Sequence, residues 1–125
     1  MTQEDKDLLI KDLCARLPYK VKCVSGVDDA TLIIEGINPN CCGASEVQVT
    51  YERSGVNFDT TISAIKPYLF PMSSMTMYQA QQWHKYANDR GGLAPSTDWL
   101  DAHHFDYRGL IPKGLALDAT NLDIY

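Results

Sequence analysis

The sequence has no long hydrophobic run and no excess of basic charge. No stretch approaches the roughly 18 apolar residues that read as a membrane-spanning helix, so we expect no membrane partner. Lys and Arg number 11 against 16 Asp and Glu, a net charge of −5. Because broad nucleic-acid binding usually needs a basic face, this balance argues against that function. It favours protein partners or small molecules.

Short motifs that mark common catalytic and phosphate-binding sites are also missing. The chain has neither G-x-G-x-x-G nor G-x-x-x-x-G-K, and no G-x-S-x-G, so the standard phosphate loops and the nucleophile elbow are absent. No cofactor is indicated, and the pattern favours a non-enzymatic protein. The first residues are acidic, whereas a signal peptide starts with basic residues. We therefore expect a cytoplasmic protein.

The cysteines lack the paired spacing of metal or redox motifs. The four cysteines are Cys14, Cys23, Cys41 and Cys42, with no C-x-x-C among them, which removes support for a zinc ribbon or a thioredoxin-type site. Reduced thiols are expected in a cytoplasm. The adjacent Cys41 and Cys42 have two interpretations: a redox or metal-capturing pair, or two small residues near a turn. The missing second pair favours the turn.

Length and composition fit one globular domain over residues 1–125. Hydrophobic residues make up 45% and charged residues 22% of the 125 positions, close to the average for globular proteins. A chain of this length buries about two-thirds of its unfolded surface, so its fold requires neither metal nor disulfide. We expect a helix and a sheet over 1–64, followed by a linker and a helical part over 65–125.

A capped helix is predicted at the start of the chain. Thr2 is a good N-cap, and acidic residues follow it where the helix dipole favours them. Pro18 ends the helix near Arg16, because proline biases the preceding residue away from helical angles. Asp12 and Arg16 form an i,i+4 pair of the kind that supports a helix. At helical spacing the predicted buried stripe consists of Leu9, Ile10, Leu13, Cys14 and Leu17.

After Pro18 the hydrophobic period changes from that of a helix to that of a strand. Four short alternating segments follow, joined by turn residues such as Ser54-Gly55. Short connections favour antiparallel neighbours, so the sequence predicts an α+β fold with an N-terminal helix and a four-stranded antiparallel meander. The expected strands cover 19–23, 31–37, 47–51 and 56–62.

The second half is predicted to be a linker and two or three short helices. Residues 66–71 contain two prolines and are expected to be an extended linker. Thr76 and Gln79 fit a capping box, which starts a helix that runs to about 88 with Met77, Ala80, Trp83 and Ala87 on its apolar face. A second short helix is expected through Trp99, Leu100 and His103. Residues 115–118 form a candidate terminal strand.

Three segments resemble a family of short proteins carried by phages and mobile elements of gut anaerobes. They are Ile65–Thr76, Asp106–Ala116 and the opening Asp7–Pro18. The resemblance implies an accessory protein of phage or mobile-element origin and carries over no catalytic residues. This chain departs from the family pattern at Phe70, Met77, Tyr78 and Pro112.

The best candidate for a binding site is the segment Arg108–Gly114. Arg108 offers a planar cation and Lys113 a point cation, while Tyr107 and Trp99 are candidates to stack on a planar group. With His103, these residues make a candidate site for a small anionic, nucleotide-like ligand. The alternative is structural, with Arg108 paired to Asp106 or Asp118. The predicted function is thus non-enzymatic binding of a host protein or of such an anion.

Two other functions remain open. A small hydrolase or nuclease would use His103, His104 and Asp106, although adjacent histidines point in different directions on a helix and no metal site is expected from them. A structural or assembly protein is the other alternative. A homo-oligomer is expected in any case, because a four-stranded meander leaves sheet edges that need cover.

Overall fold

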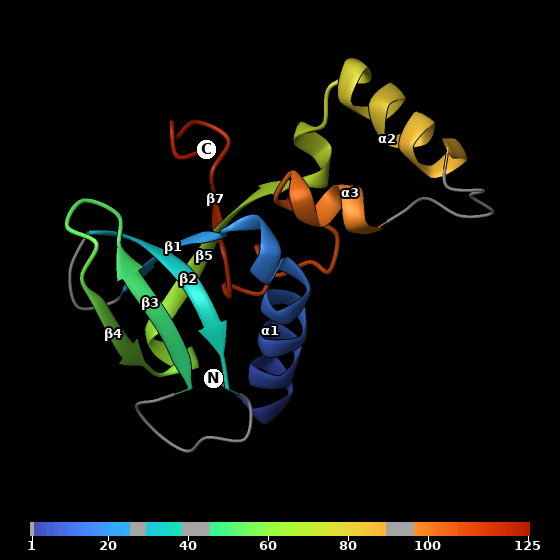
Figure 1. The fold of residues 1–125 in the computed structure, drawn as a ribbon. Helices are drawn as coiled ribbons and strands as arrows, with labels where there is room; N and C mark the ends of the chain where they lie inside the picture. The colour runs from blue at the N-terminus through green and yellow to red at the C-terminus, as the bar shows by residue number, and fades with distance from the viewer. Residues whose placement is uncertain (1, 26–29, 39–45, 90–96) are drawn as a thin grey trace.

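The computed structural model describes residues 2–25, 30–38, 46–89 and 97–125. Within these ranges the helices and strands form one mixed α/β arrangement, with helix α1 on one face of a twisted sheet (Figure 1). The helices are α1 (Gln3–Arg16), α2 (Met77–Asp89) and α3 (Thr97–Ala102), with 3-10 turns η1 (Leu17–Tyr19), η3 (Ile62–Ala64) and η4 (Met72–Ser74). The strands are β1 (Lys22–Ser25), β2 (Thr31–Ile37), β3 (Val47–Tyr51), β4 (Asn57–Thr60), β5 (Ile65–Pro71), β6 (Phe105–Asp106) and β7 (Leu117–Asp118).

The first four strands form the expected antiparallel meander, but they are part of a larger sheet. Strand order is β4-β3-β2-β1-β5-β6, and β7 also pairs with β5, which makes seven strands. β1 pairs antiparallel with β2 and with β5, whereas the short strands β6 and β7 run parallel to β5. The expected four-stranded sheet is therefore too small, because β5 and β6 were not expected, whereas β7 lies within the candidate terminal strand at 115–118.

Residues 65–71, expected to be a linker, form the strand that joins both halves of the chain. β5 lies beside β1, with Cys23 opposite Pro67 and Val24 opposite Lys66. The carbonyl of Tyr68 faces β1, where the Tyr125 hydroxyl binds it, and backbone groups alternate sides along a strand. The nitrogen of Pro67 therefore points away from β1, and no hydrogen bond to β1 is lost.

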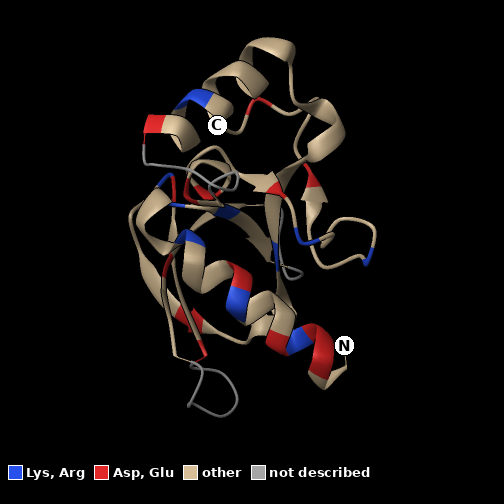
Figure 2. Cartoon of the chain, turned by 90° about the vertical axis from the view of Figure 1, so that its right-hand side faces the viewer, with Lys and Arg blue, Asp and Glu red and all other residues tan. Residues whose placement is uncertain are grey.

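Helix α1 begins and ends where the sequence predicts. The backbone N–H of Asp5 donates to the Thr2 hydroxyl at 3.1 Å, which is the expected N-cap. Leu9 and Leu13 are buried against the sheet as expected, but Cys14 is exposed, so its assignment to the core is wrong. The buried face is completed by Asp12 and Arg16 instead. Charged residues of both signs alternate along the rest of α1 (Figure 2).

Helix α2 has the predicted capping box but buries less of its apolar face than expected. The Gln79 backbone N–H donates to the Thr76 hydroxyl at 3.1 Å, and the Thr76 N–H donates to the Gln79 side chain at 2.8 Å. Ala87 is buried and Trp83 is half-buried, whereas Met77 is 80% exposed. Placing Met77 on the buried face is therefore wrong, because α2 packs on α3 and lies away from the sheet (Figure 1).

Two hydrophobic clusters hold these elements together. The larger lies between α1 and the sheet and includes Leu9, Leu32, Val49 and Leu110, all without solvent exposure. The smaller is aromatic and consists of buried Trp99, Leu100 and Phe105, with half-buried side chains of Phe70, Met72, Met75, Trp83, Tyr86 and Tyr107 packed against it. α3 and the segment after it therefore connect α2 to the body of the protein.

Two further expectations concern the cysteines and the membrane. Cys23 is a buried free thiol whose pKa burial raises to about 12. Cys41 and Cys42 lie outside the described residues. No helix in the described ranges has both the length and the apolar character needed to cross a bilayer.

Candidate functional site

A buried network of charged side chains lies where α1 meets the segment after α3. Arg16 and Asp12 are both fully buried. The Nε of Arg16 donates to Asp12 Oδ2 at 2.8 Å, and its Nη2 donates to Asp12 Oδ1 at 3.2 Å. Nη2 also donates to the carbonyl oxygen of Phe105 at 2.5 Å. The Arg16–Asp12 pair is bidentate, and the hydrogen bond to Phe105 ties the end of α1 to strand β6.

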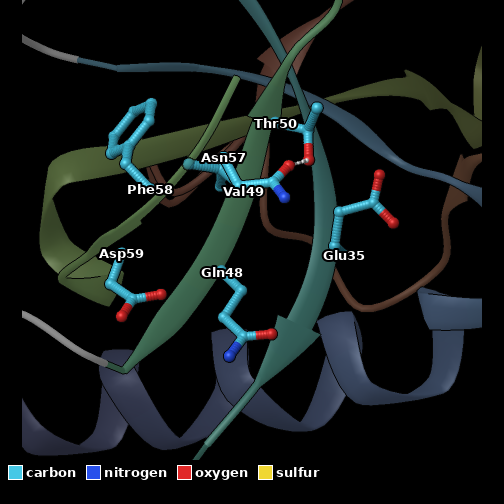
Figure 3. Close-up of a pocket in the computed structure, with 7 residues that line it drawn as sticks. All are labelled: Glu35, Gln48, Val49, Thr50, Asn57, Phe58 and Asp59. Atoms are coloured by element: carbon cyan, nitrogen blue, oxygen red, sulfur yellow. Dashed lines mark hydrogen bonds between the residues drawn. The ribbon is translucent and has the colours of Figure 1, made fainter. Parts of the chain in front are cut away.

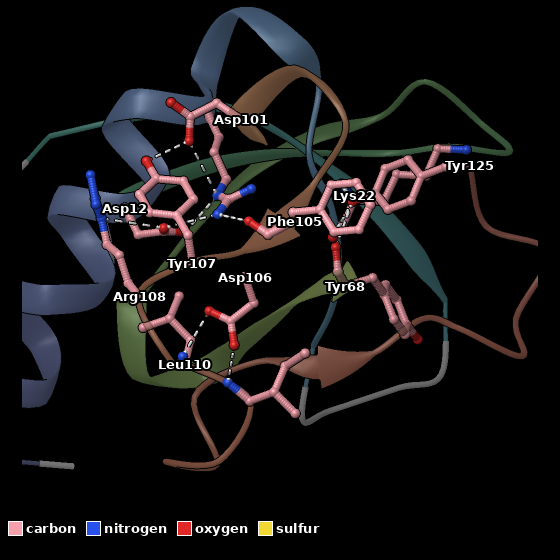
Figure 4. A network of polar contacts seen from close by, with 12 residues as sticks. Asp12, Lys22, Tyr68, Asp101, Phe105, Asp106, Tyr107, Arg108, Leu110 and Tyr125 are labelled. Atoms are coloured by element: carbon pink, nitrogen blue, oxygen red, sulfur yellow. Dashed lines mark hydrogen bonds and ion pairs between the residues drawn. The ribbon is translucent and has the colours of Figure 1, made fainter. Parts of the chain in front are cut away.

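Asp101 and Tyr107 extend the network towards the surface (Figure 4). The Tyr107 hydroxyl donates to Asp101 Oδ1 at 2.7 Å, and Arg16 Nε lies 3.9 Å from the same oxygen. Burial raises the pKa of Asp101, against the lowering effect of the Tyr107 hydrogen bond and of Arg16. Burial and the Asp101 contact raise the pKa of Tyr107 to about 12. Tyr107 therefore remains a hydrogen-bond donor at neutral pH.

Arg108 is the member of the network that reaches solvent. Its Nε lies 3.5 Å from Asp12 Oδ1, and its guanidinium carbon lies 4.7 Å from the centre of the Tyr107 ring. The side chain is 19% exposed. Arg108 Nε and Arg16 Nη1 are buried, and neither has a hydrogen-bond partner among the described residues. The network thus contains more N–H groups than acceptors.

The structure brings together Arg108 and Tyr107, two of the residues predicted from the sequence. The partner of Arg108 is Asp12, on α1, so the structural alternative that paired Arg108 with Asp106 or Asp118 is wrong. Sequence reasoning missed Asp12 because it precedes Arg108 by most of the chain length. Lys113 is exposed, and the structure gives it no ion pair with these residues.

Trp99 does not offer the open stacking surface that the sequence predicts. Its side chain is 7% exposed. The His103 ring stacks on it with centroids 3.9 Å apart, and Phe105 stacks at 5.9 Å. His103 itself is exposed and its Nδ1 lies 2.8 Å from the carbonyl oxygen of Trp99. Trp99 and His103 therefore stabilise the aromatic cluster, apart from Arg108.

His104 occupies a strained and buried position. Its φ of 63° is in the left-handed region, which side chains other than glycine rarely adopt. The ring stacks on Tyr125 with centroids 3.7 Å apart. Burial, with the nearby positive charges of Arg16, His103 and Lys22, lowers the pKa of His104 to about 4. The imidazole is therefore neutral near pH 7.

The side chain of Tyr125 links two strands, a role that was not predicted from the sequence. Its hydroxyl accepts the backbone N–H of Lys22 at 2.8 Å and donates to the carbonyl of Tyr68 at 2.8 Å. It thus bridges β1 and β5 just beyond their last aligned pair. The Nζ of Lys22 also donates to the carbonyl of Ile124 at 2.6 Å.

The three residues of the hydrolase alternative have separate structural partners. Asp106 accepts the backbone N–H of Leu110 at 2.8 Å and that of Ile111 at 2.9 Å. His103 contacts Trp99, and His104 contacts Tyr125. Among the residues that the structure describes, no group of three or more His, Cys, Asp or Glu side chains is placed to hold a metal ion.

The lowered pKa of His104 predicts that acid destabilises the fold. Between the ordinary pKa of about 6.5 and the folded value of about 4, the unfolded chain binds a proton that the folded chain does not. As the pH is lowered through this window, the free energy of unfolding therefore decreases by about 3 kcal/mol because of this group. Urea unfolding at a series of pH values measures how the free energy of unfolding depends on pH.

The variant His104→Asn should flatten this dependence, and asparagine tolerates a positive φ. His84→Asn, on the exposed face of α2, should leave the dependence unchanged. Equal slopes in all three proteins would contradict the assignment.

Comparison of the chain with protein-family models, with curated proteins and with solved structures gives no match.

Proposed function

We propose that the protein is a non-enzymatic accessory protein that binds a small anionic, nucleotide-like ligand at Arg108. The observation that carries the proposal is the buried Nε of Arg108, which has no hydrogen-bond partner in the described part of the chain. A buried donor without a partner costs about 1–3 kcal/mol, and an ion or water is a common reason for its presence. Because Nε has only the 3.5 Å ion pair with Asp12, the guanidinium is incompletely satisfied, and an anion would bind at the part of the side chain that is exposed.

The surroundings of Arg108 support an anion rather than another protein carboxylate. Both oxygens of Asp12 already accept hydrogen bonds from Arg16, so Asp12 holds Arg108 only at the longer distance of 3.5 Å. Tyr107 lies under the guanidinium, which fixes its plane. A planar fork held this way suits two oxygens of a phosphate or carboxylate.

The phage or mobile-element origin is part of this proposal and rests on the resemblance of three segments alone. Binding of a host protein is the second form of the same function. The exposed Met77 and Tyr78 at the start of α2, 80% and 70% exposed, favour it, because methionine and tyrosine are enriched in protein interfaces. Self-association, expected from the sequence, stays a prediction.

Thermal unfolding with inorganic phosphate, ATP or adenosine tests anion binding. Phosphate or ATP should raise the melting temperature, since a ligand that binds only the folded state stabilises it, and adenosine should not. Arg108→Ala should weaken ATP binding by about 1.5–3 kcal/mol, the range for a hydrogen bond that involves charge. Arg108→Lys should recover little, because it keeps the charge but loses the fork.

Arg53→Ala is the matched control, because it removes an equal charge from an exposed turn. It should leave the ATP-induced shift unchanged. If no anion shifts the melting temperature of the wild type, and Arg108→Ala simply lowers it by several degrees, Arg108 serves the fold through Asp12 and the proposed function is wrong.

A further inference from the structure

Strand β4 forms one edge of the sheet. It is the terminal strand in the sheet order, and in the described ranges it pairs only with β3. An edge strand presents unpaired backbone N–H and C=O groups, which makes it a template for another extended chain. The question is which chain its side chains would select.

The pattern of hydrogen bonds between β3 and β4 shows which backbone groups of β4 point away from the sheet. Tyr51 N–H donates to the carbonyl of Val56 at 2.9 Å, so this pair faces inward. Hydrogen-bonded pairs alternate along an antiparallel ladder, which makes Phe58 the next residue of β4 to bond β3. The backbone N–H and C=O groups of Asn57 and Asp59 therefore point away from the sheet.

The same two residues line an open depression of about 600 Å³ on the sheet face opposite α1 (Figure 3). Glu35, Gln48 and Thr50 line it as well. Its surface carries two carboxylates, and none of the side chains that line it is basic. Thr50 donates its hydroxyl hydrogen to Asn57 Oδ1 at 2.6 Å, which fixes the Asn57 amide across the floor.

A β-bulge places Glu35 beside this depression. The register between β2 and β3 shifts between Ile34 and Gly36, so Glu35 is the extra residue. A Cβ at Gly36 would lie 3.0 Å from the side-chain oxygen of Gln48. A larger residue at position 36 would therefore require the Gln48 amide to shift by a few tenths of an ångström. Bulges commonly redirect a side chain next to a functional site, and this one adds the Glu35 carboxylate to the depression, two strands in from the β4 edge.

We propose that the β4 edge binds an extended, basic segment of a partner polypeptide as an additional strand. The backbone of Asn57 and Asp59 would pair with the segment, and a Lys or Arg side chain of the segment would lie against Asp59. Glu35 lies on β2, two strands further in, and would add only to the negative potential of the depression. A second copy of this chain fits poorly, because its β4 strand carries Asp59 and no basic side chain to set against the acidic depression. The site is separate from Arg108, so each proposal can fail without the other.

Two short peptides test the proposal: an acetylated, amidated peptide of alternating lysine and valine, and its glutamate–valine counterpart. Fluorescence anisotropy gives the affinities, and NMR shows which amides respond. The lysine peptide should bind at least about fivefold tighter, since opposite-charge cross-strand pairs contribute about 0.2–1 kcal/mol each. The amides of Asn57 and Asp59 should shift most. A lysine peptide N-methylated on the paired side should not bind.

Variants separate strand pairing from charge. Asn57→Pro removes one outward N–H and keeps the charge, a change that edge strands tolerate, and it should abolish binding. Asp59→Asn should weaken binding about two- to fivefold, equivalent to one cross-strand charge pair. Glu4→Gln, an equal charge change on α1, should not alter it.

Three outcomes would overturn the proposal. The first is that neither peptide binds, and the second is that the N-methylated peptide binds as well as its parent. The third is that the lysine peptide still binds folded Asn57→Pro protein and that spermine displaces it from there. The last two would mean that the depression takes small cations and that the strand edge is not involved. If Asn57→Pro fails to fold, the N-methylated peptide still decides the question with the wild-type protein.

Discussion

Replacing Arg16 with methionine is expected to lower the free energy of unfolding by about 3–5 kcal/mol, the usual cost of leaving a buried charge without its partner. Arg16 is fully buried, and it donates two hydrogen bonds to the equally buried Asp12. The substitution also removes the donor to the Phe105 carbonyl. Urea unfolding monitored by fluorescence measures the change, and the denaturant slope should stay constant.

The double variant Asp12→Leu/Arg16→Met tests the reason. Each single variant leaves one charge buried, whereas the double variant removes both, and such apolar replacements are often neutral or stabilising. The double variant should therefore be more stable than Arg16→Met. Asp7→Leu/Lys11→Met, which makes the same changes at two exposed i,i+4 positions of the same helix, is the control, because exposed charges of opposite sign contribute only about 0–1 kcal/mol. Additive effects of the two single changes would contradict a coupled pair.

The local features of the fold were predictable because short stretches of sequence decide them. Thr2 and the capping box at Thr76 determine where α1 and α2 begin. Pro18 ends the first helix, and alternation in 31–37 and 47–51 gives two strands at the expected positions. In each case a few neighbouring residues satisfy or remove backbone hydrogen bonds, which a linear pattern records.

β5 was not predictable in the same way, because its pairing depends on residues far away. Two prolines within 65–71 resemble a linker, and only the placement of β1 shows that Pro67 loses no hydrogen bond. β6 and β7 have two residues each and pair with β5 alone. A two-residue strand carries no periodicity of its own, so β6 gave no signal, and β7 was located only as part of the candidate strand at 115–118.

The candidate site was predicted in part. Arg108 and Tyr107 are adjacent in sequence and do act together. The sequence predicts Asp12 and Arg16 as an i,i+4 pair that supports the helix but does not predict their burial, because an i,i+4 charge pair looks the same whether exposed or buried. One signal was present: both residues lie at helical spacing from Leu9 and Leu13, on the same face of α1. A charged pair on an apolar stripe predicts a buried ion pair.

Replacing Asp106 with alanine is expected to lower the free energy of unfolding by about 2–5 kcal/mol, because it leaves two backbone donors without an acceptor at about 1–3 kcal/mol each. Asp106 accepts the N–H groups of Leu110 and Ile111. Leu110 is fully buried in the main core, so this carboxylate holds the turn that places Leu110 there. Urea unfolding measures the loss, and amide exchange should speed up first at Leu110 and Ile111.

Asp106→Asn separates this role from the hydrolase alternative. An amide oxygen can accept one of the two hydrogen bonds, while its NH₂ group faces the other donor, so the stability of Asp106→Asn should lie between wild type and Asp106→Ala. Asp118→Asn, which removes an exposed carboxylate of another turn, is the matched control for charge. A phosphodiesterase assay on wild type and Asp106→Asn completes the test. Hydrolysis lost in a variant as stable as the wild type would assign Asp106 to catalysis; a less stable variant without any change in hydrolysis would assign it to the turn.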